Sequence, residues 1–242
     1  MAKKIRRSTI DCACVIHGDY YSWDYVDRLY RGLCRNLTPK VILHVYTEAG
    51  RPVPEPYVKH SLTEWPGVSG PKKSWWYKIQ LFDSDSLSAD LLYFDLDTVI
   101  VSNIDWIWLL KPKYFWAVRD FKYLFRSKRA TANSSIMWFN TKRFNWIYQQ
   151  FDPGIIDSQQ WRNRGDQDYI YHHLSDSVRF LDFDRIQSWR WQALDGGFDF
   201  VARKHRQPGA GTSIDSKTSV LVFHGTPKPH EVEDPVIKQY WS

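Results

Sequence analysis

Residues 91–101 read LLYFDLDTVIV, an almost wholly apolar run that is interrupted by two aspartates, Asp95 and Asp97. An ionised carboxylate in an apolar interior is very costly unless it is paired. Either the aspartates emerge at the end of a strand formed by LLYF, or a cation compensates them. The choice between these two arrangements bears on both the fold and the chemistry of the chain.

Helical and extended patterns alternate on both sides of this stretch. Residues 23–37 (WDYVDRLYRGLCRNL) repeat apolar positions at intervals of three and four, which is typical of an amphipathic helix. Strands that alternate with helices indicate an α/β fold with a mixed, mostly parallel central sheet. The expected strands are 9–16, 41–47, 91–94, 114–121, 134–140 and 219–225, and the expected helices are 23–37, 73–84, 103–110, 141–151 and 165–174.

The composition is that of an ordinary globular chain with an unusual share of aromatic side chains. Of its 242 residues, 43% are hydrophobic and 17% are aromatic, and the net charge is +6. Trp and Tyr combine apolar area with a polar tip, which suits surfaces that hold sugars or bases. The charge favours an anionic ligand, but it is far weaker than the basic stripe of a dedicated nucleic-acid-binding protein.

No stretch of the sequence predicts a membrane span or a secretion signal. The basic start MAKKIRRSTI is not followed by a long apolar segment, and no run of about 20 apolar residues occurs. We therefore expect a cytoplasmic protein, in which the basic residues 3–7 are a solvated tail or make peripheral contact with a membrane. Cys12, Cys14 and Cys34 form no disulfide pattern and are expected to be buried, reduced thiols.

The spacing of Asp95 and Asp97 suggests a metal site. Side chains at i and i+2 of an extended segment point to the same side, so the two carboxylates can converge on one hard cation such as Mg²⁺ or Mn²⁺. A strand formed by LLYF would place them at its carboxyl end, where open α/β sheets bind their ligands. A D-x-D pair also occurs by chance, and an aspartate that caps a turn or helix would explain it equally well.

One metal-dependent class that carries such a motif is the haloacid-dehalogenase-type phosphatase. The stretch DLDTV resembles its D-x-D-x-[TV] motif letter for letter, with Asp95 as the nucleophile. In that class the motif opens the domain on its first strand, whereas some 90 residues precede it here. Gly165 and Asp166 would supply the later Gly-Asp motif of that class, but the residues that follow them do not match it. The phosphatase is therefore the alternative prediction.

A second class matches more of the chain. Residues 78–108 resemble a lysine-bearing helix followed by Y-x-D-x-D-T and N-I-D, and three later motifs follow in order: NSSIMWFN (133–140), GDQDYI (165–170) and HGTPKPH (224–230). This series resembles the retaining glycosyltransferases of family 8, typified by glycogenin and the bacterial lipopolysaccharide galactosyltransferases. Ser135 stands where that family more often has glycine, and His230 stands where it has tryptophan.

The resemblance implies one GT-A (Rossmann-like) domain over residues 1–242, with a nucleotide-binding half up to about residue 110. Residues 111–242 would form the acceptor side and end in a loop for the metal and the diphosphate. The implied activity is metal-dependent transfer of a sugar from a nucleotide-sugar, a UDP-sugar above all, with retention of anomeric configuration. The acceptor would be a glycan, a lipid or a protein.

The resemblance also implies roles for particular residues. Asp95, Asp97 and His224 would bind a divalent ion, and because nitrogen is a poor ligand for Mg²⁺, this set favours Mn²⁺. Lys228 would neutralise the leaving diphosphate. Asp166 or Gln167 is the catalytic candidate beside the oxocarbenium-like transition state. The residues implied to contact the nucleotide-sugar are Tyr20, Lys78, Asp95, Asp120, Asn133, Ser134, Gly225 and Lys228. In the loop HGDYY (17–21), either Tyr20 or Tyr21 would stack on the base.

A third reading is not enzymatic. A basic, aromatic-rich module that binds glycan or nucleic acid would bind in a salt-sensitive way and without metal. We predict the enzyme and no nucleic-acid partner. Trp189 and the following residues up to 197 form either ordinary core or part of an acceptor platform.

Overall fold

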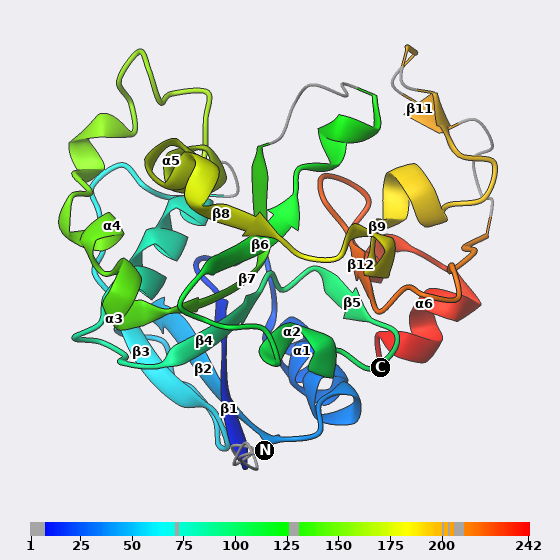
Figure 1. Ribbon diagram of the computed structural model, residues 1–242, viewed down its shortest axis with the longest axis horizontal. Coiled ribbons are helices and arrows are strands. Elements are labelled where there is room, and N and C mark those ends of the chain that lie inside the picture. The colour runs from blue at the N-terminus through cyan, green and yellow to red at the C-terminus, as the bar shows by residue number, and fades with distance from the viewer. Residues whose placement is uncertain (1–7, 71–72, 126–130, 200, 203, 206–210) are drawn as a thin grey trace, which may run out of the picture.

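The computed structural model describes residues 8–70, 73–125, 131–199, 201–202, 204–205 and 211–242 (Figure 1). The basic residues 3–7, for which peripheral membrane contact is the alternative prediction, lie outside this part of the chain. Within it, no helix is both long enough and apolar enough to cross a membrane.

A seven-stranded sheet forms the centre of the molecule, and most of its neighbouring strands are parallel. This confirms the predicted mixed, mostly parallel α/β sheet. β7 is the exception, because it runs antiparallel to both of its neighbours, β4 and β6. In spatial order the strands are β3 (Val58–Leu62), β2 (Lys40–Glu48), β1 (Thr9–Val15), β4 (Asp90–Phe94), β7 (Ala132–Asn140), β6 (Phe115–Arg119) and β8 (Val178–Phe180).

A second, three-stranded sheet lies beside the first. It has β12 (Val220–Val222) at its centre, between β5 (Thr98–Ile100) and β9 (Ile186–Ser188). β5 and β12 are antiparallel, with Thr98 opposite Val222. The chain therefore passes from the first sheet to the second within the three residues that follow β4. A short hairpin pairs β10 (Phe198–Asp199) with β11 (Lys204–His205).

The helices are mostly short, and the predicted helix 141–151 is divided into two. Asn145 stands at the break, and its side chain accepts a hydrogen bond from the Ser84 N–H at 3.2 Å. The predicted helix 73–84 is a 3₁₀ helix, η1. The helical elements are α1 (Trp23–Asn36), η1 (Ser74–Phe82), α2 (Asp105–Trp108), η2 (Phe121–Leu124), α3 (Thr141–Phe144), α4 (Trp146–Gln149), η3 (Pro153–Ile155), α5 (Asp166–Leu174), η4 (Ser175–Ser177), η5 (Phe183–Arg185), η6 (Trp189–Ala193), η7 (Pro229–Glu231) and α6 (Pro235–Tyr240).

The central sheet is buried on both faces, which explains why its strands are so apolar. On one face, Cys12 and Cys14 of β1 pack in a cluster with α1. On the other face, Leu91 and Tyr93 of β4 pack in a cluster with η1 and α5. Cys12 and Cys14 are buried free thiols, as predicted, whereas Cys34 is exposed because it lies on the outer side of α1.

Candidate active site

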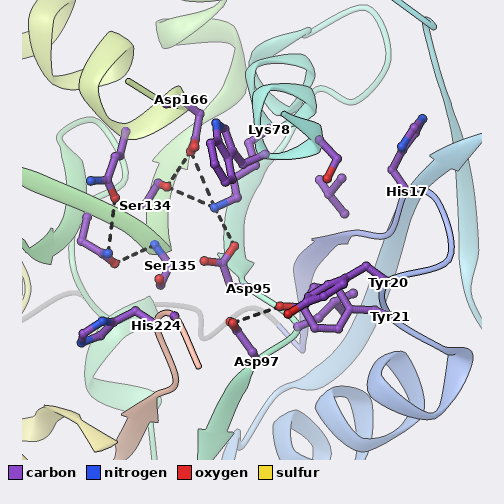
Figure 2. A pocket seen from close by; sticks show the side chains of 18 of the residues that line it. His17, Tyr20, Tyr21, Lys78, Asp95, Asp97, Ser134, Ser135, Asp166 and His224 are labelled. Atoms are coloured by element: carbon purple, nitrogen blue, oxygen red, sulfur yellow. Dashed lines mark hydrogen bonds and ion pairs between the residues drawn. The ribbon is translucent and has the colours of Figure 1, made fainter. Parts of the chain in front are cut away.

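A cavity of about 700 Å³ lies beside the carboxyl ends of β1 and β4. Its walls come from the loop after β1, η1, the turn after β4, the start of β7, the start of α5 and the loop after β12. The volume suits a small organic ligand, and ligands of α/β sheets bind at this end of the strands. The predicted site residues that line it are Tyr20, Lys78, Asp95, Asp97, Asn133, Ser134, Asp166, Gln167, His224, Gly225 and Lys228 (Figure 2).

Asp95 and Asp97 occupy the turn that joins the two sheets. β4 ends at Phe94 and β5 begins at Thr98, and the Thr98 N–H donates to the Asp95 carbonyl at 3.2 Å. The expectation that both aspartates stand on one extended segment is therefore wrong. A turn, rather than strand alternation, presents them to the same cavity. The strand formed by the apolar run does end where predicted, so both carboxylates follow its carboxyl end.

Lys78, on η1, contacts two carboxylates at once. Its Nζ lies 2.7 Å from Asp95 Oδ1 and 3.6 Å from Asp166 Oδ2, and it donates to Ser134 Oγ at 3.2 Å. Ser134 in turn donates to Asp166 Oδ2 at 2.5 Å. Burial raises the pKa of Asp166. Burial acts in the same direction on Asp95, but the Lys78 ammonium, together with hydrogen bonds from Tyr93 and Ser135, outweighs it and holds the pKa of Asp95 below its ordinary value.

Asp97 has a different lysine. Lys228 donates to Asp97 Oδ2, and the Tyr21 hydroxyl donates to the same oxygen at 3.1 Å. Burial raises the pKa of Asp97, Lys228 opposes that effect, and the charge of Asp95 adds to it. Each aspartate of the D-x-D motif is thus held by its own lysine, one from η1 and one from the loop after β12.

The buried charges of the cavity do not balance. Asp95, Asp97 and Asp166 supply three carboxylates, whereas Lys78 and Lys228 supply two ammonium groups. Asp168 and the exposed Arg164 also line the cavity and add one charge of each sign, which leaves the surplus unchanged. In a cavity of low effective dielectric constant, a surplus negative charge favours a bound cation. The oxygen donors available here are of the kind that Mg²⁺ and Mn²⁺ prefer.

His224 adds a nitrogen donor to the same cavity. Burial, together with the charge of Arg190, lowers the pKa of His224 to about 4, so the imidazole is neutral at pH 7 and keeps a lone pair. Its Nε2 lies 2.7 Å from Ser188 Oγ. Within the described ranges, no three His, Cys, Asp or Glu side chains gather closely enough to hold one metal ion. The fit of a metal therefore rests on the chemistry of these donors and on the surplus charge.

Two further predicted positions have local structural reasons for their residue types. Gly225 has φ +75°, a left-handed conformation that favours glycine, and a Cβ there would lie 3.2 Å from Arg190 Nη1. Asn133 Nδ2 donates to Gln167 Oε1 at 3.4 Å, and Asn133 Oδ1 accepts from the Ser135 N–H at 3.0 Å. These bonds connect the start of β7 to the first turn of α5.

Asp120 is the one predicted site residue that does not line the cavity. Its side chain accepts from the Lys122 N–H at 2.9 Å and from Thr131 Oγ1 at 3.1 Å. The carboxylate therefore caps η2 and is satisfied by its neighbours, which accounts for its burial without a ligand.

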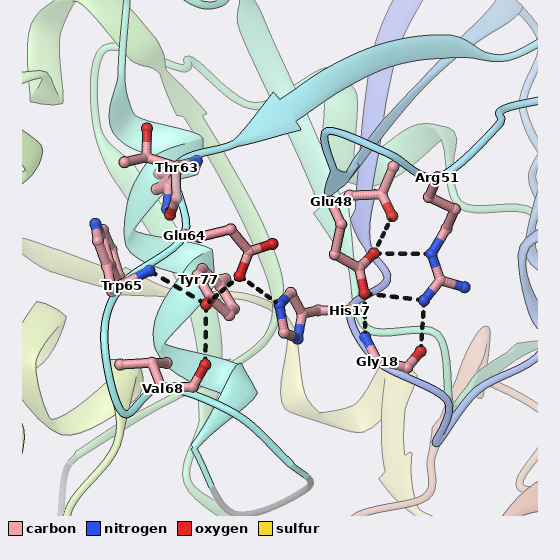
Figure 3. Close-up of polar contacts among 11 residues, drawn as sticks. His17, Gly18, Glu48, Arg51, Thr63, Glu64, Trp65, Val68 and Tyr77 are labelled. Atoms are coloured by element: carbon pink, nitrogen blue, oxygen red, sulfur yellow. Dashed lines mark hydrogen bonds and ion pairs between the residues drawn. The ribbon is translucent and has the colours of Figure 1, made fainter.

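The loop after β1 is fastened at Gly18 by an ion pair (Figure 3). The Gly18 N–H donates to Glu48 Oε1 at 2.5 Å, the Gly18 carbonyl accepts from Arg51 Nη2 at 2.7 Å, and Arg51 Nε lies 2.8 Å from Glu48 Oε2. Burial acts to raise the pKa of Glu48, but hydrogen bonds from Arg51 and Thr47 outweigh it and lower the pKa to about 2. Beside the Glu48–Arg51 pair, which we call the Gly18 clamp, His17 Nε2 lies 3.2 Å from Glu64 Oε2.

The loop held by this clamp carries two tyrosines with different surroundings. Tyr20, the predicted base-stacking residue, is 48% exposed at the rim of the cavity. Tyr21 is the one that reaches Asp97. The sequence does not distinguish the two tyrosines, because adjacent positions in a loop carry no signal for which side chain turns inward.

The segment that begins at Trp189 is mostly core. Trp189 is buried, stacks on Phe223 with 4.7 Å between ring centroids, and donates from Nε1 to Thr212 Oγ1 at 2.8 Å. Trp191 packs against the ring of His224 at 4.2 Å. Neither tryptophan lines the cavity, so the core reading is confirmed for Trp189. Trp75 and Arg164 do line it, although no motif pointed to them.

No protein-family model matches the sequence, and no curated protein matches it. The fold, however, is shared with solved glycosyltransferases. The galactosyltransferase LgtC in complex with donor and acceptor sugar analogs aligns with a TM-score of 0.61 at 12% identity, over 96% of this chain and 94% of that chain. An active-site mutant of LgtC aligns with a TM-score of 0.64 at 11% identity, over the same shares of the two chains.

Two larger proteins share the fold as well. The apo form of the glycosyltransferase GlyE of Streptococcus pneumoniae TIGR4 has a TM-score of 0.67 at 14% identity, and 96% of this chain covers 59% of that one. The bifunctional glycosyltransferase WbbM has a TM-score of 0.58 at 12% identity, and 94% of this chain covers 48% of it. The predicted GT-A fold class is therefore confirmed, and this chain spans little more than half of GlyE.

Proposed function

We propose that this protein is a metal-dependent glycosyltransferase that transfers a sugar from a nucleotide-sugar, a UDP-sugar above all, with retention of anomeric configuration. The observation that carries the proposal is the unbalanced set of buried charges in the cavity. Three carboxylates and a neutral imidazole suit a divalent cation, and a lysine in a loop stands directly beside them. The shared fold and the order of the four sequence motifs support the same assignment.

When bound by Asp95, Asp97 and His224, a divalent ion, Mn²⁺ above all with Mg²⁺ as the alternative, would offset the negative charge of the diphosphate. Lys228 would exchange its bond to Asp97 for one to a phosphate oxygen. Charge-assisted bonds of this kind stabilise the negative charge that develops on a leaving group. The Pro-flanked loop limits the backbone freedom of Lys228, so less entropy is lost when it makes this contact.

The transferred sugar would lie against Asp166 and Gln167. The transition state at its anomeric carbon is oxocarbenium-like, so the carboxylate of Asp166 stabilises the positive charge that develops there. Lys78 and Ser134 hold that carboxylate in place at 3.6 Å and 2.5 Å. Gln167, in contact with Asn133, is suited to orient sugar hydroxyls. Tyr20 would stack on the base at the exposed rim.

The phosphatase alternative receives no support from the site. It requires Asp95 to attack phosphorus, yet Asp95 Oδ1 accepts hydrogen bonds from both Lys78 and Tyr93, each at 2.7 Å. Oδ1 is therefore not free to attack, which leaves only Oδ2 for the role that the phosphatase needs.

Calorimetry tests the proposal directly. We expect Mn²⁺ to tighten UDP binding at least about tenfold, a change of about 1.4 kcal/mol, and we expect Asp97→Ala or His224→Ala to abolish the increase. Asp184→Ala is the matched control, because Asp184 is exposed and makes only a 3.8 Å contact with Lys217. A screen of UDP- and GDP-sugars for Mn²⁺-dependent hydrolysis would then identify the donor. Equal UDP affinity with and without Mn²⁺ would refute the proposal.

A further inference from the structure

One end of the cavity has no role in the proposed binding of the donor. Figure 2 shows Lys78 and Asp166 on one side of Asp95, and Asp97 with His224 on the other. The rim on the Asp166 side is lined by Ser74, Trp75, Asn163 and Arg164. If the diphosphate lies near Asp97 and the sugar near Asp166, these rim residues lie beyond the sugar, where an acceptor must approach.

Trp75 offers a sugar-binding surface in a fixed position. Its side chain is 38% exposed, and a Cβ on Gly165 would lie only 3.0 Å from its Nε1, so the indole packs directly against the glycine backbone. Any larger residue at 165 would displace it. An exposed aromatic side chain that is held in this way can pack on the C–H face of a sugar ring at a low cost in entropy.

The two segments that form this rim are locked together beneath the surface. Trp76, next to Trp75, is buried and packs edge-on against Trp161 and Tyr169, with ring centroids 6.2 Å apart in both pairs. Trp161 precedes Arg164 on the same loop, and the Arg164 N–H donates to its carbonyl at 2.8 Å. The distance between the aromatic surface and the backbone of Arg164 is therefore set by buried packing.

Arg164 differs from the other cations of the cavity. Lys78 and Lys228 each lie against carboxylates, whereas no carboxylate lies within 4.0 Å of Arg164 in the part of the chain that the structure describes. The guanidinium is exposed and is 5.6 Å from the ring of Trp161. A planar guanidinium binds a carboxylate or a phosphate through two parallel hydrogen bonds.

We infer that Trp75 and Arg164 form an acceptor subsite for a sugar that carries a negative charge. The indole packs on the ring of the acceptor, and the guanidinium pairs with its carboxylate or phosphate. This inference rests on the proposed function, because it takes the donor sugar to lie at Asp166 and Gln167. It names the chemical class of the acceptor, which that function leaves open.

Binding of glycoside probes, measured by calorimetry without nucleotide, tests the subsite. The probes are p-nitrophenyl β-D-glucuronide and glucose 6-phosphate, which carry the two kinds of anion, and p-nitrophenyl β-D-glucoside as the neutral analogue of the first. We expect an anionic probe to bind at least about tenfold tighter than the glucoside, and Arg164→Gln to remove that difference. Trp75→Ala should weaken binding of the charged and the neutral glycosides alike.

Arg162→Gln is the matched control, because Arg162 is an exposed arginine two residues away that does not line the cavity. Equal binding of glucuronide and glucoside by the unmodified protein, with glucose 6-phosphate no tighter, would overturn the inference. So would a loss of UDP–Mn²⁺ affinity in Arg164→Gln, which would assign Arg164 to the donor. If UDP–Mn²⁺ binding is absent from the unmodified protein while glucuronide binding persists, the proposed function fails separately from the subsite.

Discussion

Two charged clusters, one that lines the cavity and one that holds the loop beside it, are built in opposite ways. Around Lys78, one ammonium group contacts Asp95 and Asp166, and the side chains of Lys78 and Asp166 are only 11% and 5% exposed, whereas that of Asp95 is 20% exposed. Around Gly18, the guanidinium of Arg51 pairs with the carboxylate of Glu48, and these side chains are 19% and 23% exposed. The second cluster also satisfies both backbone groups of Gly18.

The difference lies in the charge balance. The Glu48–Arg51 pair is neutral as a whole and is complete without a ligand, so its role is to hold a loop. The Lys78 cluster has more carboxylates than lysines, and because buried surplus charge is unfavourable, a bound cation or a proton on Asp166, whose pKa burial raises, would stabilise it. The balance of buried charge thus separates a structural ion pair from a binding site, although both contain the same types of residue.

The largest effect should follow from removal of the lysine that serves two carboxylates. Lys78→Met keeps the length of the side chain but leaves Asp95 and Asp166 buried without a counter-charge, and we expect the free energy of unfolding to fall by about 3–5 kcal/mol. Arg51→Met should cost at most about 1 kcal/mol, since its pair is partly exposed. Urea denaturation with a chelator present measures both losses. Equal losses for Lys78→Met and Arg51→Met would contradict the expected difference between the two clusters. Adding Asp166→Asn to Lys78→Met should restore part of the stability.

An intermediate, pH-dependent effect is expected at Glu48. Its pKa is about 2 in the folded protein against an ordinary value of 4.5, so its stabilising effect is complete above about pH 4.5 and is lost as the pH falls towards 2. Glu48→Gln should therefore lower the unfolding free energy by about 1 kcal/mol at pH 7 and by progressively less between pH 4.5 and pH 2. Denaturant titrations at several pH values, with the exposed Glu233→Gln as control, test this. If Glu48→Gln lowered the unfolding free energy by the same amount at every pH in that range, the carboxylate would not act through its charge.

The smallest effects should come from the two tyrosines that donate to the D-x-D aspartates. Tyr93 donates to Asp95 at 2.7 Å and Tyr21 donates to Asp97 at 3.1 Å. Each Tyr→Phe change removes one hydroxyl while the aspartate keeps its lysine, so we expect losses of only about 0.5 kcal/mol in unfolding free energy, with the shorter bond of Tyr93 giving the greater one. Thermal denaturation of both variants compares them, and a greater loss for Tyr21→Phe would reverse the expected order.

The sequence predicted which strand and which helix carry the site residues, because the positions of these elements depend on local pattern. The apolar run LLYF had to be a buried strand, so Asp95 and Asp97 had to follow its end. The DQ pair at 166 and 167 had to begin a helix, because a helical pattern follows Gly165. Each of these inferences uses residues that are neighbours in the chain, where periodicity and capping are informative.

The contacts inside the site could not be predicted in the same way. Lys228 and Asp97 are separated by 131 positions, and no local pattern indicates which lysine meets which aspartate. Asp120 was assigned to the cavity by resemblance, but its carboxylate turned back to cap η2. Trp75 and Arg164 belong to no motif, and they meet at one rim through the packing of Trp76 on Trp161 and of Trp75 on Gly165, both of which join residues far apart in the sequence.

The antiparallel pairing of β5 with β12 has a consequence for the synthesis of the protein. The Phe223 N–H donates to the Asp97 carbonyl at 3.2 Å, so the second half of the site is attached to the first through β12, a strand that follows the D-x-D turn by more than 120 positions. A nascent chain that still lacks residues beyond 222 has the D-x-D turn but neither His224 nor Lys228. Residues up to at least 228 must therefore leave the ribosome before the proposed diphosphate site is complete, and neither half made separately should bind a diphosphate.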